Sequence, residues 1–379
     1  GAELSSRGLL LFLFLFGARS LFIFVMVSVT SHLVASMQMA KVFKPPVHAH
    51  SHSSPQFAAT SQYVVNALDF HAAADVLVAS RDDDTIRIYN TNTGNFVAEL
   101  GLKKYGCSLV RFTHHHASVL HASNKEVGGD TEAVEKSHAL RYLSLHDNQY
   151  LQYFYGHVQK VTSLDMAPMN DLFMSSSEDR SVRLWDLRKN KSVDVIATGP
   201  HPVAAYDRQG LVFAVGGPGG NVKLYDVRSY KKPFAVFQVP ADRLQTVNAM
   251  AWGVTPDNVP CTRVKFSMDG KALLLSFDGA WVMLDAYEGK VKAAASTRGE
   301  NDDMSPGSAL TEASLSPDGK YVVAGCADRR IRAWSHDNAD PMQPLQPFAT
   351  FDGHAGVPRC VKWAPRRLLM ASACSAVAL

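Results

Sequence analysis

Residues 156–188 read GHVQKVTSLDMAPMNDLFMSSSEDRSVRLWDLR, and this stretch decides the fold. An alternating apolar run from Val161 to Met166 ends at a turn that contains Pro, Asn and Asp. A second run covers Leu172 to Ser176 and ends at a Glu-Asp turn, and a third covers Val182 to Asp186. Short runs of period two with tight turns between them predict a meander of three antiparallel strands. No 3.6-residue period is sustained, so we expect no helix in this stretch.

The same strand pattern recurs along the chain. Further copies begin at Val65, His201, Thr262, Glu312 and Val357, and another, from Cys107 to His146, is interrupted by the polar segment KEVGGDTEAVEKSH. Trp185 and Tyr225 are 40 residues apart, and Leu284 and Trp334 are 50 apart. These distances fit a propeller blade of about 40–45 residues with loop insertions. Seven blades are therefore predicted over residues 39–379, with insertions near 125–138, 241–260 and 297–310.

One blade carries a recognisable signature. Gly156-His157 ahead of Trp185-Asp186 is the GH…WD pattern of WD40 repeats. We expect a relay of side chains that joins His157, Ser177 on the second strand, Asp179 in the tight turn and Trp185 on the third strand. Buried polar groups that are fully paired fix a single blade geometry. The four residues are thus predicted to be structural, and the fold to be an all-β, seven-bladed WD40 β-propeller.

Both ends of the chain are expected to meet in the last blade. Closing the ring removes exposed strand edges, and AKVFK, residues 40–44, is placed to supply the closing strand. The seventh copy stops at SACSAVAL. We therefore expect a truncated last blade, which either lacks its third strand or keeps residues 376–379 as a stub of it.

The most hydrophobic stretch, LLLFLFLFGARSLFIFVMVSV, covers residues 9–29. It is long enough to span a bilayer, but Arg19 near its middle costs about 2.5–3.5 kcal/mol at a bilayer centre. As a signal peptide it has Arg7 as a positive start. Because Met37 stands just before the first propeller strand, we expect residues 1–38 to be an apolar extension translated upstream of the true start. A targeting segment and a membrane anchor are the alternatives.

Composition excludes several classes of function. The net charge of +3 over 379 residues is too small to indicate nucleic acid as a direct partner. The five cysteines have neither CxxC nor zinc spacing, so we expect buried free thiols in a reducing compartment. Nothing fixes metal geometry around HAHSH (48–52) or HHH (114–116), and GGPGG (216–220) lacks the GK[ST] ending of a phosphate loop. We predict no catalytic residues, no metal, no cofactor and no enzyme.

Six segments go beyond the general repeat pattern. They are KKYG (103–106), LRYLSLHDNQY (140–150), GLVFAVGGPGGNVKLYDVRSY (210–230), PFAVFQV (233–239), LDAYEG (284–289) and MASACS (370–375). On these segments, the chain from about Ala40 to Ser375 resembles the family of WD repeat-containing protein 82. The resemblance implies a nuclear, non-catalytic scaffold of COMPASS-type histone H3 methyltransferase complexes and of a protein phosphatase 1 complex. It also implies links to RNA 3′-end processing and to the phosphorylated tail of RNA polymerase II. A membrane partner is expected only if residues 9–29 are retained.

Loop cations supply a candidate binding face for such a tail. In a propeller, the turns between second and third strands and the connections between blades gather on one face. The candidate residues there are Arg81, Lys103, Lys104, Tyr105, Lys160, Arg180, Arg329 and Arg330. Arginine binds phosphate bidentately, and Tyr105 is suited to stack on a peptide proline, so we predict an extended phosphopeptide as the ligand. The alternative is a set of solvated loop charges, several of them paired with the neighbouring Asp82–Asp84, Asp179 or Asp328.

A different class of function rests on WDLR, residues 185–188. This stretch matches the WDxR box of propellers that act as substrate receptors of cullin-4 ubiquitin ligases. Trp185, Asp186 and Arg188 would carry it, with Arg188 reaching the adaptor. Because the fold itself demands Trp-Asp, the box alone does not separate a receptor from a scaffold. A membrane-tethered or secreted propeller is the third possibility, and it rests on residues 9–29.

Overall fold

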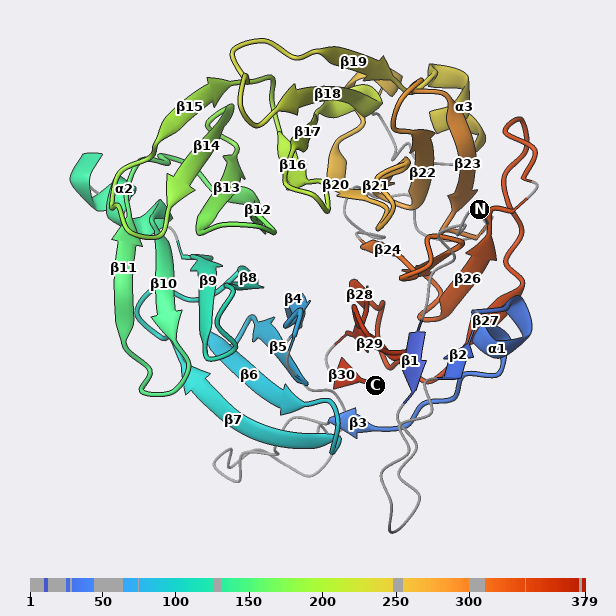
Figure 1. Cartoon of the computed structure of the whole chain (residues 1–379), viewed down its shortest axis with the longest axis horizontal. Helices are drawn as coiled ribbons and strands as arrows, with labels where there is room; N and C mark the ends of the chain where they lie inside the picture. The colour runs from blue at the N-terminus through green and yellow to red at the C-terminus, as the bar shows by residue number, and fades with distance from the viewer. Residues whose placement is uncertain are drawn as a thin grey trace, which may run out of the picture.

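A computed structural model describes residues 10–12, 25–27, 29–43, 64–73, 75–125, 131–247, 255–299, 311–337, 339–374 and 377–379. In it, seven four-stranded antiparallel sheets surround a central axis (Figure 1). The predicted all-β, seven-bladed propeller is therefore confirmed.

Each of the first six blades uses four consecutive strands. Blade 1 contains β4 (Val65–Phe70), β5 (Val76–Arg81), β6 (Thr85–Asn90) and β7 (Asn95–Gly101). Blade 2 contains β8 (Leu109–Phe112), β9 (Ser118–Ala122), β10 (Leu140–Ser144) and β11 (Tyr150–Phe154). Blade 3 contains β12 (Val161–Met166), β13 (Leu172–Ser177), β14 (Ser181–Asp186) and β15 (Asp194–Ala197).

The next three blades repeat this order. Blade 4 contains β16 (Val203–Tyr206), β17 (Val212–Gly216), β18 (Asn221–Asp226) and β19 (Ala235–Gln238). Blade 5 contains β20 (Cys261–Phe266), β21 (Ala272–Phe277), β22 (Ala280–Asp285) and β23 (Val291–Ser296). Blade 6 contains β24 (Ala313–Leu315), β25 (Tyr321–Gly325), β26 (Ile331–Ser335) and β27 (Ala349–Phe351).

Blade 7 joins the two ends of the chain, as predicted. Its strands are β28 (Cys360–Trp363), β29 (Met370–Ala373), β30 (Val377–Ala378) and the N-terminal β3 (Val42–Phe43). Phe43 pairs with Val377, and its ring lies 4.4 Å from that of Tyr89 in blade 1. The third strand of this blade has two residues, whereas the third strand of blade 3 has six. In the described residues, the third strand of the last blade is therefore much shorter than that of blade 3.

The core lies between the blades. Seven buried apolar clusters are present in the described residues, and each is shared by two neighbouring blades. Strand alternation produces this arrangement, because successive side chains point to opposite faces of a sheet. In β5, for example, Leu77 and Ala79 pack toward blade 7, while Val78 between them packs toward blade 2.

A few elements lie outside the blades. Two helices fall in predicted insertions, α2 (Thr131–His138) and α3 (Ala241–Thr246), and the short 3₁₀ turns are η2 (Pro218–Gly220) and η3 (Pro256–Asn258). N-terminal to the blades are the strands β1 (Leu10–Phe12) and β2 (Val25–Val27), which pair, and α1 (Ser31–Ala35). Helix α1 buries Val34 in the cluster between blades 6 and 7. No described helix has the length and hydrophobicity needed to cross a membrane.

The ring has two faces with different connections. One carries the turns between second and third strands together with the connections between blades, and we call it the interblade face. The two kinds of loop meet there, since the Leu102 N–H donates to the Asp84 carbonyl at 2.7 Å and the Glu178 N–H to the Lys160 carbonyl at 2.9 Å. The opposite face carries the remaining hairpin turns, and we call it the hairpin face.

Candidate functional site

Blade 3 contains a continuous chain of four side chains. The indole Nε1–H of Trp185 donates to Ser175 Oγ at 2.8 Å. Ser175 Oγ lies 2.8 Å from Nε2 of His157, and Nδ1 of His157 lies 2.7 Å from Oδ2 of Asp179. His157 and Trp185 are 1 % and 0 % exposed, so the relay excludes water.

Chemistry fixes the direction of every bond in this relay. An indole N–H only donates and a carboxylate only accepts, so Ser175 donates its hydroxyl proton to His157 Nε2, and His157 Nδ1–H donates to Asp179. The imidazole is neutral in this arrangement, and burial indeed lowers the pKa of His157. Burial opposes the charge of Asp179, but hydrogen bonds from His157 and Ser181 outweigh it and hold the pKa of this carboxyl below its usual range.

The predicted place of Ser177 in the relay is wrong, and Ser175 occupies it. Trp185 pairs across the sheet with Phe173, so on the same face Ser175 is its diagonal neighbour and Ser177 lies one step further away. Ser177 instead closes the turn: its hydroxyl donates to the Gln159 carbonyl at 2.9 Å and accepts the Asp179 N–H at 3.2 Å.

A second, shorter relay lies in blade 7 and was missed in the sequence. His354 Nε2 lies 2.8 Å from Ser372 Oγ, and His354 Nδ1 lies 3.2 Å from Cys374 Sγ. A thiol thus stands where blade 3 has a carboxylate. The available signal was Gly353-His354, which repeats the Gly-His pair that begins blade 3.

Acidic side chains on innermost strands connect neighbouring blades. Asp69 of blade 1 accepts the backbone N–H of Phe112 in blade 2 at 2.7 Å and forms an ion pair with Lys362 of blade 7. Asp165 of blade 3 accepts the N–H of Tyr206 in blade 4 at 2.9 Å. Such bonds hold the inner ends of the blades together, and the Asp69–Lys362 pair crosses the seam between the two ends of the chain.

Six of the predicted cations are exposed on the interblade face, and five of these have no carboxylate partner among the described residues. These five are Lys103, Lys104, Lys160, Arg180 and Arg329. Within the described part of the chain, no carboxylate oxygen lies within 4 Å of their charged nitrogens, so these five are solvated loop charges without a local partner. Arg330 differs, because it pairs with Asp352 at 2.6 Å.

These cations form three separate pairs. Lys160 and Arg180 lie close together in blade 3, where Glu178 N–H bonds to the Lys160 carbonyl. Lys103 and Lys104 lie on the connection from blade 1 to blade 2. Arg329 and Arg330 belong to blade 6, across the ring from blade 3 (Figure 1). Of the three pairs, only the one in blade 6 contains a residue with a carboxylate partner, Arg330.

Arg81 does not belong to this surface, which corrects the prediction. Its side chain is 2 % exposed at the end of β5 and pairs with Asp83 at 2.9 Å. Burial lowers the pKa of its guanidinium, while Asp83 opposes that shift. A side chain enclosed in this way is not accessible to a peptide on the interblade face.

Tyr105 lies in a cluster of tyrosines whose proximity was not predicted from the sequence. The guanidinium carbon of Arg141, a buried residue, lies 3.7 Å from the centre of the Tyr105 ring. Lys104 Nζ lies 4.9 Å from the same centre. Tyr153 of β11 lies 6.4 Å from Tyr105 and stacks on Tyr155 at 6.2 Å. Since Arg141 already covers Tyr105, the half-exposed Tyr153 and exposed Tyr155 offer more ring surface to a ligand.

The WDLR stretch presents one residue to the surface. Trp185 and Asp186 are 0 % and 4 % exposed. The side chain of Arg188 is 75 % exposed and holds Asp186 through two hydrogen bonds, at 2.9 and 2.8 Å. An adaptor would therefore meet Arg188 and not the other two.

Histidines and cysteines have ordinary structural surroundings. His114 Nε2 lies 2.8 Å from the Asn170 carbonyl, and the rings of His115 and His116 stack at 4.8 Å. The HAHSH segment lies outside the described residues. All five cysteines are free and buried, and burial raises the pKa of Cys261 and of Cys360 to about 12. The predicted buried thiols are confirmed.

Comparison with known proteins agrees with the fold. The WD40 family, described as WD domain, G-beta repeat, matches residues 51–90, 148–186 and 306–335. Protein ANTHESIS POMOTING FACTOR 1 of Arabidopsis thaliana is 38 % identical over 82 % of this chain and 84 % of its own. WD repeat-containing protein 82 of Drosophila melanogaster is 36 % identical over 83 % and 89 %. COMPASS component SWD2 of Saccharomyces cerevisiae is 31 % identical over 82 % and 88 %.

Proposed function

Since the chain belongs to the family of WD repeat-containing protein 82, we propose that it is a non-catalytic scaffold subunit of a COMPASS-type histone H3 methyltransferase complex in the nucleus. The similarity to a relative named as a COMPASS component carries this proposal, because it extends over 88 % of that relative. A propeller braced by buried relays suits a scaffold, since it holds loops in fixed positions without moving parts. A protein phosphatase 1 complex and the RNA 3′-end processing machinery are further assemblies that the family resemblance implies.

Affinity purification tests this proposal. The chain, tagged and expressed in its native source, is purified from nuclear extract at moderate salt, and the bound proteins are identified by mass spectrometry. Recovery of methyltransferase subunits supports the proposal, and recovery of phosphatase 1 extends it. A preparation that holds neither contradicts it.

The same purification tests the alternative of a cullin-4 substrate receptor. The exposed Arg188 favours that alternative, because its guanidinium lies on a turn of the hairpin face and is 75 % exposed while it bonds to Asp186. Recovery of cullin-4 and its adaptor, lost on Arg188→Ala, supports the receptor. Arg228, which is 80 % exposed and holds Asp226 in the same way, offers the matched control Arg228→Ala.

We further propose that the interblade face binds the phosphorylated tail of RNA polymerase II. Lys103, Lys104, Lys160 and Arg180 supply cations without carboxylate partners among the described residues, and charge-assisted bonds to phosphate are the strongest that such groups form. Tyr153 and Tyr155 beside them offer flat rings for prolines. The expected ligand is therefore an extended, proline-containing phosphopeptide.

Fluorescence anisotropy with a labelled tail peptide tests this binding. The phosphorylated peptide should bind, and the unphosphorylated one should bind at least about tenfold more weakly. Lys103→Glu with Lys104→Glu should cost about another tenfold. The matched control is Lys231→Glu with Lys232→Glu, an exposed lysine pair on the hairpin face, and it should change affinity less than about twofold. Equal loss in both pairs would point to unspecific attraction and contradict the proposal.

A further inference from the structure

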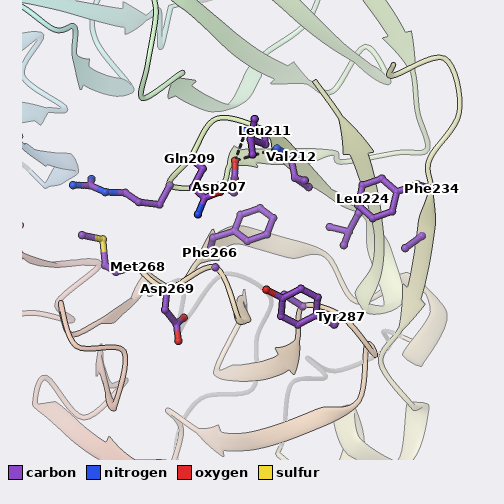
Figure 2. A pocket seen from close by; sticks show the side chains of 14 residues that line it. Asp207, Gln209, Leu211, Val212, Leu224, Phe234, Phe266, Met268, Asp269 and Tyr287 are labelled. Atoms are coloured by element: carbon purple, nitrogen blue, oxygen red, sulfur yellow. Dashed lines mark hydrogen bonds between the residues drawn. The ribbon is translucent and has the colours of Figure 1, made fainter. Parts of the chain in front are cut away.

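A pocket of about 290 Å³ opens on the hairpin face between blades 4 and 5. Its floor is apolar, with Phe266 of β20 and Leu224 of β18. The walls come from four separate turns, and Figure 2 shows Phe234 and Tyr287 on the same side of Phe266. The pocket lies on the opposite side of the ring from the cations proposed to bind phosphate.

Large apolar side chains gather around this opening. Leu211, Phe234, Met268 and Tyr287 line the pocket and are 48 %, 61 %, 37 % and 73 % exposed. A single exposed apolar side chain needs no explanation, but several around one cavity mark a surface for a ligand or partner. These four side chains come from separate turns of blades 4 and 5. Their grouping around one opening is therefore not explained by the folding of any single turn.

The rim carries two carboxylates with spare acceptor capacity. Asp207 Oδ1 accepts the N–H groups of Leu211 and Val212 at 2.8 and 3.0 Å. Asp269 Oδ1 bonds to the Ser267 hydroxyl and to the Lys271 N–H at 2.5 and 3.0 Å. In the described residues, no hydrogen bond or ion pair engages the second oxygen of either carboxylate. One guanidinium, that of Arg208, also lines the pocket, which leaves the rim net negative.

We propose that this pocket is a docking site for a linear segment of a partner protein, one that inserts an aromatic or long aliphatic side chain and places a Lys or Arg beside Asp207 and Asp269. The apolar floor accepts the inserted side chain, and the free carboxylate oxygens accept the cation. Carboxylates held by backbone N–H groups are preorganised, so a bound cation need not order them.

Size and symmetry favour a linear segment over other occupants. The cavity has about the volume of ten water molecules, which is room for one or two side chains and not for a folded surface. A second copy of this chain docked with its two-fold axis through the pocket would bring the same carboxylates face to face, and like charges oppose such contact. The site is independent of the proposed phosphopeptide face, so either proposal can fail without the other.

Selection from a phage-displayed library of random dodecapeptides tests the proposal with the full chain as bait. Enriched peptides are synthesised with a fluorescent label and measured by anisotropy. We expect a consensus of one aromatic or aliphatic residue next to Lys or Arg. Phe234→Ala with Tyr287→Ala should weaken binding at least about tenfold, and Asp207→Asn with Asp269→Asn several-fold. The exposed Phe96 of β7 offers the control Phe96→Ala, which should leave affinity unchanged.

Three results would overturn the proposal. One is the absence of any such consensus. Another is binding that the pocket variants and Phe96→Ala affect equally, since that places the peptide elsewhere. The third is concentration-dependent dimerisation in sedimentation velocity that Phe234→Ala with Tyr287→Ala removes, since a second copy is then the occupant. Because all three substituted rings are more than half exposed, the variants are expected to keep the wild-type circular dichroism spectrum.

Discussion

Blades 3 and 7 begin with the same Gly-His pair and are held together in different ways. Blade 3 has the complete relay of His157, Ser175, Trp185 and Asp179 and a third strand of six residues. Blade 7 has a histidine, a serine and a thiol, and a third strand of two residues. Blade 3 therefore has a complete set of buried polar bonds within the blade, whereas blade 7 has only part of such a set.

The neighbours of blade 7 supply what its own strands lack. Phe43 from the N-terminal strand contacts Tyr89 of blade 1, and Lys362 pairs with Asp69 across the seam. The Val65 N–H also donates to the Cys374 carbonyl at 2.8 Å. The same kind of blade can thus be stabilised by polar bonds within it or by contacts between the chain ends.

The largest expected difference in stability between the two blades comes from substitutions of buried residues in their third strands. Trp185 is fully buried and stacks on Phe173 at 6.0 Å. Trp185→Ala should lower the free energy of unfolding by about 4 kcal/mol, because it leaves a large cavity and removes the donor to Ser175. In blade 7, Val377→Ala should cost only about 1.5 kcal/mol. Urea unfolding followed by circular dichroism compares the two, and equal losses would remove the distinction between the blades.

The two histidines should differ next. His157→Ala strips a buried carboxylate and a buried hydroxyl of their partner and should cost about 3 kcal/mol. His354 is only half-buried and bonds to no carboxylate of the described residues, so His354→Ala should cost about 1 kcal/mol. Thermal unfolding of both variants under one set of conditions measures this difference. A larger loss of stability for His354→Ala than for His157→Ala would show that the relay contributes more to blade 7 than to blade 3.

The serines of β13 give a finer comparison within blade 3. Ser175→Ala leaves the Trp185 N–H and the acceptor nitrogen of His157 without their partner, at a cost of about 2 kcal/mol. Ser177→Ala removes only turn bonds and should cost about 1 kcal/mol. Urea midpoints of the two variants decide between the assignments. A larger loss of stability for Ser177→Ala than for Ser175→Ala would indicate that Ser177, and not Ser175, is the relay serine.

Mild acid, near pH 6, should produce the smallest effect, and it should act on blade 3. Because burial lowers the pKa of folded His157, the unfolded chain binds the proton more readily. The contribution of the relay is then complete above about pH 6.5 and is lost as the pH falls below that value, by at most about 1.4 kcal/mol per pH unit. The variant His157→Gln should lack this part of the pH dependence between pH 7.5 and 5.5. An unchanged slope would mean that His157 is not the group that titrates.

Much of the fold could be predicted from sequence, because blade repeats are local patterns. Gly156-His157 ahead of Trp185-Asp186 fixed one blade, and spacing located the others. The relay serine was misassigned because residues 175–177 are three consecutive serines, and only the register with Phe173 separates them. Arg81 was misplaced because the sequence shows a turn nearby but not the burial of the side chain.

The pocket on the hairpin face could not be predicted in this way. Phe234 and Tyr287 are 53 residues apart in the sequence and belong to different blades. Each alone reads as an ordinary turn residue, and the cavity exists only because the two blades pack side by side. Likewise, Tyr153 and Tyr155 lie near Tyr105 only because β11 packs against the loop that follows blade 1.

The central claim is that this propeller is a subunit of a COMPASS-type complex and contacts other subunits of it directly. Cross-linking mass spectrometry of the affinity-purified native complex, with a lysine-reactive reagent, tests it most directly. We predict cross-links from the exposed Lys103, Lys104 and Lys160 of the interblade face to other subunits, together with the methyltransferase subunit itself in the sample. A purified sample without that subunit, or one in which no lysine of this chain is linked to any other subunit, would contradict the claim.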